Sequence, residues 1–252
     1  PPPPPPPPPP PKKPHPPPPE QQPDLRRQRQ MCIRDRFIDN AISKSKKTNN
    51  KILDKMIAKF KELPSGKKYS RNLLKAFMMD ASNKKYKNWN DLLYYCKFSA
   101  NPVGRFVIDA VNERKNIEKI YEASDSLCTA LQIINHIQDC KKDFKELNRV
   151  YIPESFFKKY SLNNSILSKN KSIKNFARLK IEIIDNVLAS LKITKVGLNK
   201  IQSWRLRKET LIILNIAKRL CNLLKINDPL EKQIKLSRID FIFCFFKGIM
   251  YD

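Results

Sequence analysis

Residues 124–153 of this chain read SDSLCTALQIINHIQDCKKDFKELNRVYIP. Apolar side chains recur three and four residues apart through the first half of the stretch: Leu127, Leu131, Ile134 and Ile137. This is the spacing of one helix face, and no Gly or Pro interrupts the run before Pro153. Residues 131–153 are therefore predicted to form one long helix that ends at Pro153, within a chain whose composition favours helices.

A second stripe on the same predicted helix is polar and consists of Gln132, Asn135, Asp139 and Asp143. Side chains three or four residues apart lie on one helix face. Two carboxylates one turn apart can bind hard cations such as Mg²⁺, which in turn bind diphosphate. The alternative is a solvated face on which Asp139 pairs with Lys142. The amides favour a polar ligand cavity, because amides on a core-facing stripe need hydrogen-bond partners.

The same stretch resembles the second aspartate-rich motif of the squalene/phytoene synthase family. A second block, YYCKFSANPVGR at residues 94–105, resembles the family's Tyr-Cys…Ala-Gly-Thr-Val-Gly element. Its form SANPVGR is most similar to the bacterial hydroxysqualene synthase branch of hopanoid biosynthesis. The resemblance runs from about Phe37 to the C-terminus. It implies an all-α isoprenoid synthase fold of about eight helices around a central apolar cavity.

The resemblance also implies roles for individual residues. The expected catalytic residues are Asp139, Asp143, Tyr95 and Tyr151. The expected substrate-binding residues are Gln132, Asn135, Arg149, Ala100 and Val103. The expected ligands of Mg²⁺, the implied cofactor, are Asp139, Asp143, Asn135 and Asp39. Asp39 closes a first DxxxD pattern at residues 35–39, which is expected to face the second motif across the cavity.

The implied reaction is the conversion of presqualene diphosphate to hydroxysqualene with release of diphosphate. A condensing squalene or phytoene synthase is the alternative within the family. An inactive, membrane-associated scaffold with the same fold is the alternative of another class. Many family members carry Arg immediately before the first acid of the second motif, whereas this chain has Gln138. One positive charge fewer favours a substrate with a single diphosphate.

Charge and cysteine usage narrow the class of protein and its location. The formal net charge of +26 comes mainly from lysines spread over every segment, so no nucleic-acid partner is expected. A basic surface favours approach to an anionic bilayer. The six cysteines show no paired or zinc-binding spacing, which favours a reduced cytoplasmic location, with peripheral contact at the inner face of the membrane. The resemblance adds contact with other hopanoid or carotenoid pathway enzymes.

The N-terminal 36 residues differ in kind from the rest of the chain. Seventeen of the 21 prolines lie within residues 1–24, and a run of prolines offers no apolar side chains for a core. The string MCIRDR at residues 31–36 resembles a translated sequencing-adapter remnant. We therefore expect residues 1–36 to be a disordered assembly artefact without packed core. Residues 37–252 would be a synthase-like domain that lacks its N-terminal helices.

Four further expectations concern other helices and individual residues. Helices are predicted at residues 173–191, 197–224 and 230–250, and no chemistry is predicted for residues 71–80. His136 lies off the polar stripe and is predicted to pack in the core. Gly104 is expected to let two helices approach, so that a larger side chain would block the substrate more than it destabilises the fold.

Overall fold

The computed structural model describes the backbone of residues 22–45 and 47–250 and the side chains of this part of the chain from Ile33 onward. Helices and their connections make up the described residues, which contain no strand. The helices are α1 (Gln22–Lys44), α2 (Lys51–Lys59), α3 (Ser65–Ala81), α4 (Trp89–Ser99), α5 (Asn101–Ala110), α6 (Ile117–Gln138), α7 (Cys140–Leu147), α8 (Glu154–Lys159), the 3-10 helix η2 (Asn164–Ser168), α9 (Lys174–Leu198), α10 (Trp204–Ile226) and α11 (Arg238–Met250). The predicted all-α class is confirmed.

Short polar side chains fix where several helices begin. Asn50 accepts hydrogen bonds from the backbone N–H groups of Ile52 and Leu53 at the start of α2, and Asn88 accepts from the N–H of Asp91 at the start of α4. Such caps satisfy N–H groups that have no partner within the helix.

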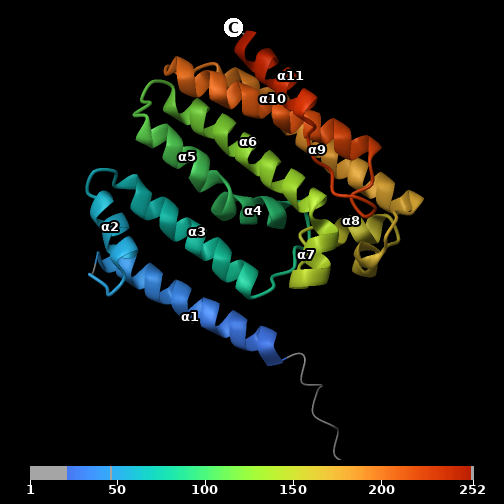
Figure 1. Ribbon diagram of the computed structural model, residues 1–252, viewed down its shortest axis with the longest axis horizontal. Helices are drawn as coiled ribbons and strands as arrows, with labels where there is room; N and C mark the ends of the chain where they lie inside the picture. The colour runs from blue at the N-terminus through green and yellow to red at the C-terminus, as the bar shows by residue number, and fades with distance from the viewer. Residues whose placement is uncertain (1–21, 46, 251–252) are drawn as a thin grey trace, which may run out of the picture.

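Helix α6 lies at the centre of the molecule. It packs mainly against α9, and also against α5, α10 and the end of α4. Helix α3 contacts α4 and α5 on one side and α1 on the other, so that α3 separates α1 from the central layer (Figure 1). Helix α11 covers α10 at the opposite end of this stack. The second-motif helix is therefore held on several sides.

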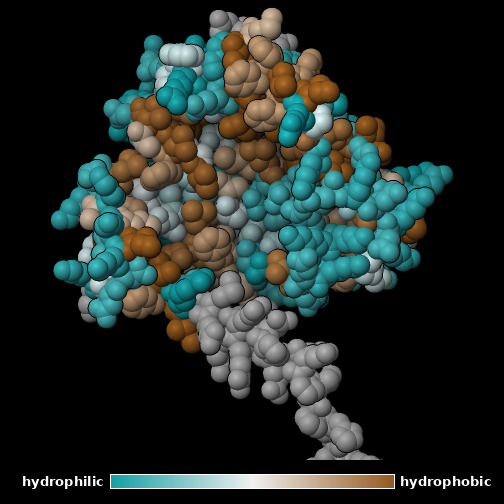
Figure 2. All heavy atoms as spheres, viewed as in Figure 1, coloured by the Kyte–Doolittle hydropathy of each residue, from teal (hydrophilic) through white to brown (hydrophobic). Residues whose placement is uncertain are grey.

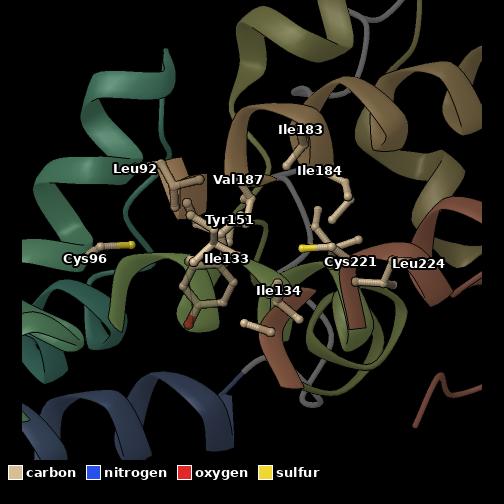
Figure 3. Packing of buried hydrophobic residues seen from close by; sticks show 14 of the residues in the cluster. Leu92, Cys96, Ile133, Ile134, Tyr151, Ile183, Ile184, Val187, Cys221 and Leu224 are labelled. Carbon is tan, nitrogen blue, oxygen red and sulfur yellow. The ribbon is translucent and has the colours of Figure 1, made fainter. Parts of the chain in front are cut away.

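Two apolar clusters stabilise this arrangement. The larger joins α4, α6, α9 and α10, and its fully buried members include Ile133, Ile184 and Leu224; Figure 3 shows these side chains together with Tyr151. The smaller cluster joins α1, α2 and α3 through Ala41, Ile42, Leu53 and Leu74. Because burial of apolar area is the main favourable term in folding, the larger cluster anchors the central helices.

The long helix predicted for residues 131–153 is broken in the structure. Asp139 leaves helical geometry with φ −101° and ψ 8° and separates α6 from α7, which ends at Leu147. No Gly or Pro causes this break. Side chains on both sides of it are held by a distant segment, since Gln138 donates to the carbonyl of Ile234 and Lys141 to the carbonyl of Leu230. Tertiary hydrogen bonds therefore override the local helical pattern.

The expected boundary at Phe37 is not a boundary of secondary structure. Helix α1 begins at Gln22 and runs through Phe37 without interruption. Residues 24–36 contain neither Gly nor Pro and are rich in Arg and Gln, which are good helix formers, and a proline at position 23 is tolerated in a first helical turn. The expectation of disorder is therefore wrong for residues 22–36. Residues 1–21, with the long proline run, lie outside the described residues.

Candidate functional site

The break between α6 and α7 brings two acids to the start of a helix. The N–H of Asp139 donates to the carbonyl of Asn135 at 2.9 Å, and the carbonyl of Asp139 accepts from the N–H of Asp143 at 2.8 Å. Asp139 is the N-cap residue of α7 and Asp143 lies in its first turn. Carboxylates are favoured there by the positive end of the helix dipole. One aspartate at the kink and one in the following turn thus form an acidic pair.

This acidic pair is not neutralised by the protein. No Lys or Arg in the described part of the chain forms an ion pair with Asp139 or Asp143, and Asp139 has only a long contact of 3.4 Å with the amide of Gln233. Burial and the negative charge of Asp139 together raise the pKa of Asp143 to about 6, although the charges of Arg149 and Lys142 oppose the shift. The pair therefore carries unfavourable negative charge that a cation would relieve.

The donor set of this pair fits Mg²⁺. Magnesium is usually held by one or two carboxylates together with water and substrate phosphates, and Asp139 and Asp143 supply two carboxylates. Among the residues that the structure describes, no cluster of three His, Cys, Asp or Glu side chains suits a metal ion. The remaining ligands would therefore come from phosphate oxygens and water.

A third acid, Asp80 at the end of α3, lies close to this pair. Its carboxylate accepts hydrogen bonds from the hydroxyls of Tyr95 and Tyr151, both at 3.0 Å. Burial raises the pKa of Asp80, whereas the charge of Arg149 and the two tyrosine hydroxyls lower it. The negative charge of Asp80 also contributes to the raised pKa of Asp143. Asp80 therefore connects two predicted catalytic tyrosines to the acidic pair.

Aromatic rings line the inner side of this cluster. The ring of His136 stacks on that of Tyr151 with centroids 3.6 Å apart and an interplanar angle of 14°, and Nε2 of His136 lies 3.0 Å from the amide nitrogen of Gln132. Complete burial lowers the pKa of His136 to about 3, so the imidazole is neutral. The predicted packing role of His136 is confirmed, and the residue also links Gln132 to the tyrosines.

The structure places most, though not all, of the sequence-predicted residues in this cluster. Those brought together by hydrogen bonds, ring contacts or electrostatic interaction are Tyr95, Tyr151, Gln132, Asp139, Asp143 and Arg149. Asn135 shares the helix face of the acids, is exposed and has only its backbone hydrogen bonds to Asp139 and within α6. Ala100 is buried at the break between α4 and α5, and Val103 is half exposed on α5.

Asp39 lies in a different environment from the one expected. It is on α1, where its carboxylate forms an ion pair with Arg71 of α3 at 2.7 Å. Asp35, one turn earlier, is 1% exposed and is paired with Arg34, and its second carboxylate oxygen is buried without a partner. Within the described contacts, the acid that interacts with Asp143 from across the cluster is Asp80 and not Asp39.

The expectation for Gly104 is half confirmed. Gly104 lies on α5 against α6, where a Cβ atom would be 2.7 Å from Sγ of Cys128 and still closer to the hydroxyl of Ser124. Gly104 therefore allows the two helices to approach. A larger side chain there would collide with α6, so the fold would lose stability, and the expected effect on the substrate remains a prediction.

Asp80 is the functional candidate that the sequence interpretation missed. It lies in the last turn of α3, and that turn contains no basic residue. An acid at a helix C-terminus is unfavourable, because the dipole is negative there. An acid at the end of an amphipathic helix, with no basic residue in the same turn, is therefore a pattern from which Asp80 could have been predicted as a functional residue.

Comparison with solved structures places this arrangement in the isoprenoid synthase fold. The chain superposes on the crystal structure of a dehydrosqualene synthase in complex with ligand with a TM-score of 0.70 and 17% identity, covering 91% of this chain and 78% of that one. The crystal structure of squalene synthase HpnC from Alicyclobacillus acidocaldarius gives a TM-score of 0.63 and 20% identity, covering 74% and 69%. These likenesses confirm the predicted fold.

The chain belongs to the squalene/phytoene synthase family, whose profile matches residues 20–240. Two curated relatives are the hydroxysqualene synthases of Sinorhizobium fredii, 35% identical over 69% of this chain and 59% of that protein, and of Rhodopseudomonas palustris, 33% identical over 71% and 60%. The aligned region thus spans about three fifths of their length. Members of this family are enzymes that act on isoprenoid diphosphates, so the predicted family is confirmed.

Proposed function

We propose that this protein converts presqualene diphosphate to hydroxysqualene with release of diphosphate, in a reaction that depends on Mg²⁺. The observation that carries the proposal is the acidic pair Asp139 and Asp143, which forms no salt bridge in the described residues and lies within electrostatic reach of Arg149. The similarity to curated hydroxysqualene synthases supports the choice of substrate.

In this proposal the acids and Arg149 surround the leaving group. Asp139 and Asp143 would hold Mg²⁺, and bound Mg²⁺ would neutralise charge on the departing diphosphate. Arg149 contributes a fixed positive charge that the protein itself supplies. The carbon–oxygen bond to diphosphate breaks, a water oxygen bonds to the rearranged carbon skeleton, and the water gives up one proton. Exposed Asn135 and half-exposed Val103 would also contact substrate.

The tyrosines have a separate role in the proposal. Their hydroxyls donate to Asp80, which fixes the rings of Tyr95 and Tyr151 in one orientation. The faces of aromatic rings attract cations, so the two rings and the neutral His136 ring can stabilise positive charge without reacting with it. Ala100 and Gln132 would complete this wall.

A condensing squalene or phytoene synthase is the second candidate. It is favoured by the structural likeness to a squalene synthase and a dehydrosqualene synthase and by weaker similarity to plant phytoene synthases. Against it, Gln138 replaces the expected Arg, and its uncharged amide donates to the carbonyl of Ile234 at 2.6 Å.

Incubation with Mg²⁺ and a single substrate tests these candidates. Hydroxysqualene from presqualene diphosphate, with no turnover of farnesyl diphosphate, is the expected result. Turnover of farnesyl diphosphate would favour the condensing reaction, and no turnover of either substrate would favour the inactive scaffold. Omitting Mg²⁺ in the presence of a chelator should stop the release of diphosphate.

Three expectations from the sequence remain predictions. These are a cytoplasmic location with peripheral contact at the inner membrane face, contact with other hopanoid or carotenoid pathway enzymes, and the artefactual origin of residues 1–36. Resequencing the locus would test the last: a proline tract contiguous with the codon for Phe37 would contradict it. The family match begins at residue 20, within the segment that was expected to be an artefact, so the experiment addresses an open contrast.

A further inference from the structure

A connecting segment, residues 227–237, lies against the break between α6 and α7 and accepts hydrogen bonds from side chains on both sides of it. The segment leads from α10 to α11; neither these nor the other helices of the described residues are long and apolar enough to span a membrane. The amide of Gln138 donates to the carbonyl of Ile234 at 2.6 Å. The ammonium group of Lys141 donates to the carbonyl of Leu230, also at 2.6 Å. The break is therefore held from both sides by one distant part of the chain.

The connecting segment is itself held in place by buried contacts. Two of its apolar side chains belong to the larger buried cluster. Lys180 of α9, which is only 4% exposed, donates to the carbonyl of Asn227. The backbone N–H and the hydroxyl of Ser172 donate to the carboxylate of Asp228. Because a buried ammonium group is costly unless it finds such partners, the two carbonyls at the break belong to a fixed structure.

The local sequence does not require a break at this point. Residues 131–147 contain neither Gly nor Pro, and backbone hydrogen bonds of helical spacing continue on each side of Asp139. Helix α7 has eight residues, and a helix of this length is only marginally stable on its own. The position of α7 relative to α6 must therefore come from tertiary contacts, and those of Gln138 and Lys141 lie within two residues of Asp139.

We propose that Gln138 and Lys141 are positioning residues of the metal site, which hold the break and thereby direct the carboxylates of Asp139 and Asp143 toward a shared cation. The inference rests on the proposed role of these two acids as ligands of Mg²⁺. Gln138 immediately precedes Asp139, so the hydrogen bond of its side chain fixes the backbone from which that carboxylate extends. Lys141 does the same from the other side, between the two acids.

The contacts of Lys141 support this role. Its ammonium group has two oxygen acceptors, the carbonyl of Leu230 and the amide oxygen of Asn170, the latter at 3.0 Å. In the described residues it forms no ion pair with Asp139 or Asp143, although it lies between them in the sequence. A lysine paired with these acids would compete with a cation. Because the connecting segment engages Lys141, the acids stay available.

The acidic pair remains within reach of solvent. Asp139 is only half-buried, and a long contact of 3.4 Å joins its carboxylate to the amide of Gln233 in the connecting segment. Figure 2 shows hydrophilic side chains over the side of the molecule on which α7 and α8 lie. A hydrated cation can therefore reach the carboxylates while their backbone stays fixed from within.

The double variant Gln138→Met with Lys141→Met tests the proposal, because it keeps side-chain length and helix propensity and removes both donors. The apparent KM for Mg²⁺ should rise at least tenfold, and calorimetric titration with Mg²⁺ in the presence of inorganic diphosphate should show the same loss of affinity. Residues that only stabilise the fold would change the folded fraction and lower kcat with the KM for Mg²⁺ unchanged, which would overturn the proposal. Lys141→Arg, which can still donate to a carbonyl, should retain most of the affinity.

Matched controls are Lys145→Met, an exposed lysine of the same helix, and Gln202→Met, an exposed glutamine after α9. Both should leave the KM and the affinity for Mg²⁺ unchanged, and a loss as large as that of the double variant in either would contradict the proposal. Should the double variant unfold, Lys141→Met alone, which removes no buried apolar group, decides: its affinity for Mg²⁺ should fall at least threefold.

Hydrogen exchange in metal-free buffer tests the same contacts without relying on the proposed function. Exchange at residues 138–143 should change at least threefold in the double variant and not in the controls, because α7, once released, either frays or joins α6 in a continuous helix. Unchanged exchange would overturn the proposal. A wild-type chain that binds no Mg²⁺ would refute the proposed metal ligands and with them the positioning role, even where exchange shows that the connecting segment holds the break.

Discussion

Two pairs of aspartates in this protein share the same DxxxD spacing and lie in opposite environments. Asp35 and Asp39 on α1 are each paired with an arginine, Arg34 and Arg71. Asp139 and Asp143, at the break between α6 and α7, have no such partner in the described residues, and burial and mutual repulsion raise the pKa of Asp143 to about 6. The second pair thus carries negative charge that the protein leaves uncompensated.

The difference shows that spacing alone does not define a metal site. A carboxylate already bound to a guanidinium has lost most of its electrostatic attraction for a cation. A carboxylate held near another acid in a partly buried place gains when a cation binds. The environment therefore favours Asp139 and Asp143 over Asp35 and Asp39 as the proposed metal ligands.

The largest effect should come from neutralising the uncompensated pair. Asp139→Asn should lower Mg²⁺-dependent release of diphosphate about a hundredfold or more, because it removes a ligand charge, while the helical circular dichroism stays unchanged. The matched change Asp39→Asn should lower it only about threefold. Equal losses in the two variants would mean that Asp39 also binds the metal, and the contrast between the pairs would fail.

An effect of intermediate size on turnover is expected at Asp80. Asp80→Asn removes the charge that orients the hydroxyls of Tyr95 and Tyr151, so turnover should fall about tenfold. The double variant Asp80→Asn with Tyr95→Phe should lose little more than Asp80→Asn alone, because the two residues act together. Steady-state kinetics would measure both. Losses that multiply would show that Tyr95 acts independently of Asp80.

The pKa of Asp143 predicts a stability effect in metal-free buffer. Because the folded-state pKa is raised from about 3.8 to about 6, the native state holds a proton that the unfolded state has lost between these values. The contribution of Asp143 to the free energy of unfolding therefore decreases as pH rises from about 4 to 6. Asp143→Asn should raise the melting temperature by a few degrees at pH 7 and hardly at all at pH 4.

Thermal melts at both pH values, with and without Mg²⁺, would check this. Added Mg²⁺ should stabilise the wild-type protein and not the variant, since binding to the native state alone stabilises it. A variant less stable than the wild type at pH 7 without metal would show that Asp143 is neutralised by the protein after all.

The smallest effect is expected at the neutralised pair. Arg71→Ala removes the partner of Asp39, and both side chains are partly exposed, so the free energy of unfolding should change by less than about 1 kcal/mol. The affinity for Mg²⁺, measured by isothermal titration calorimetry, should not change. Tighter metal binding in this variant would show that Asp39 competes for the same ion and would bring the two pairs into one site.

Much of the fold and part of the site could be predicted from local patterns. Apolar periodicity predicts the existence of α9, α10 and α11, since helical spacing is a property of neighbouring residues, but it misplaces the end of α9 and the starts of α10 and α11 by seven or eight residues. The stripe of Gln132, Asp139 and Asp143 predicts the acidic pair, because residues one turn apart remain neighbours even across a kink. The motifs around Tyr95 and Tyr151 predict two members of the aromatic cluster.

What the sequence by itself determined is therefore the helical class, the family and the identity of the uncompensated acids. Only the tertiary structure decided that Asp139 breaks the helix, that Asp80 holds both tyrosines, that Arg71 neutralises Asp39, and that a side chain at Gly104 would enter α6. Each of these depends on contacts between residues far apart in the chain. Local spacing does not encode which distant group lies opposite a side chain, and that group sets its charge, its pKa and the space around it.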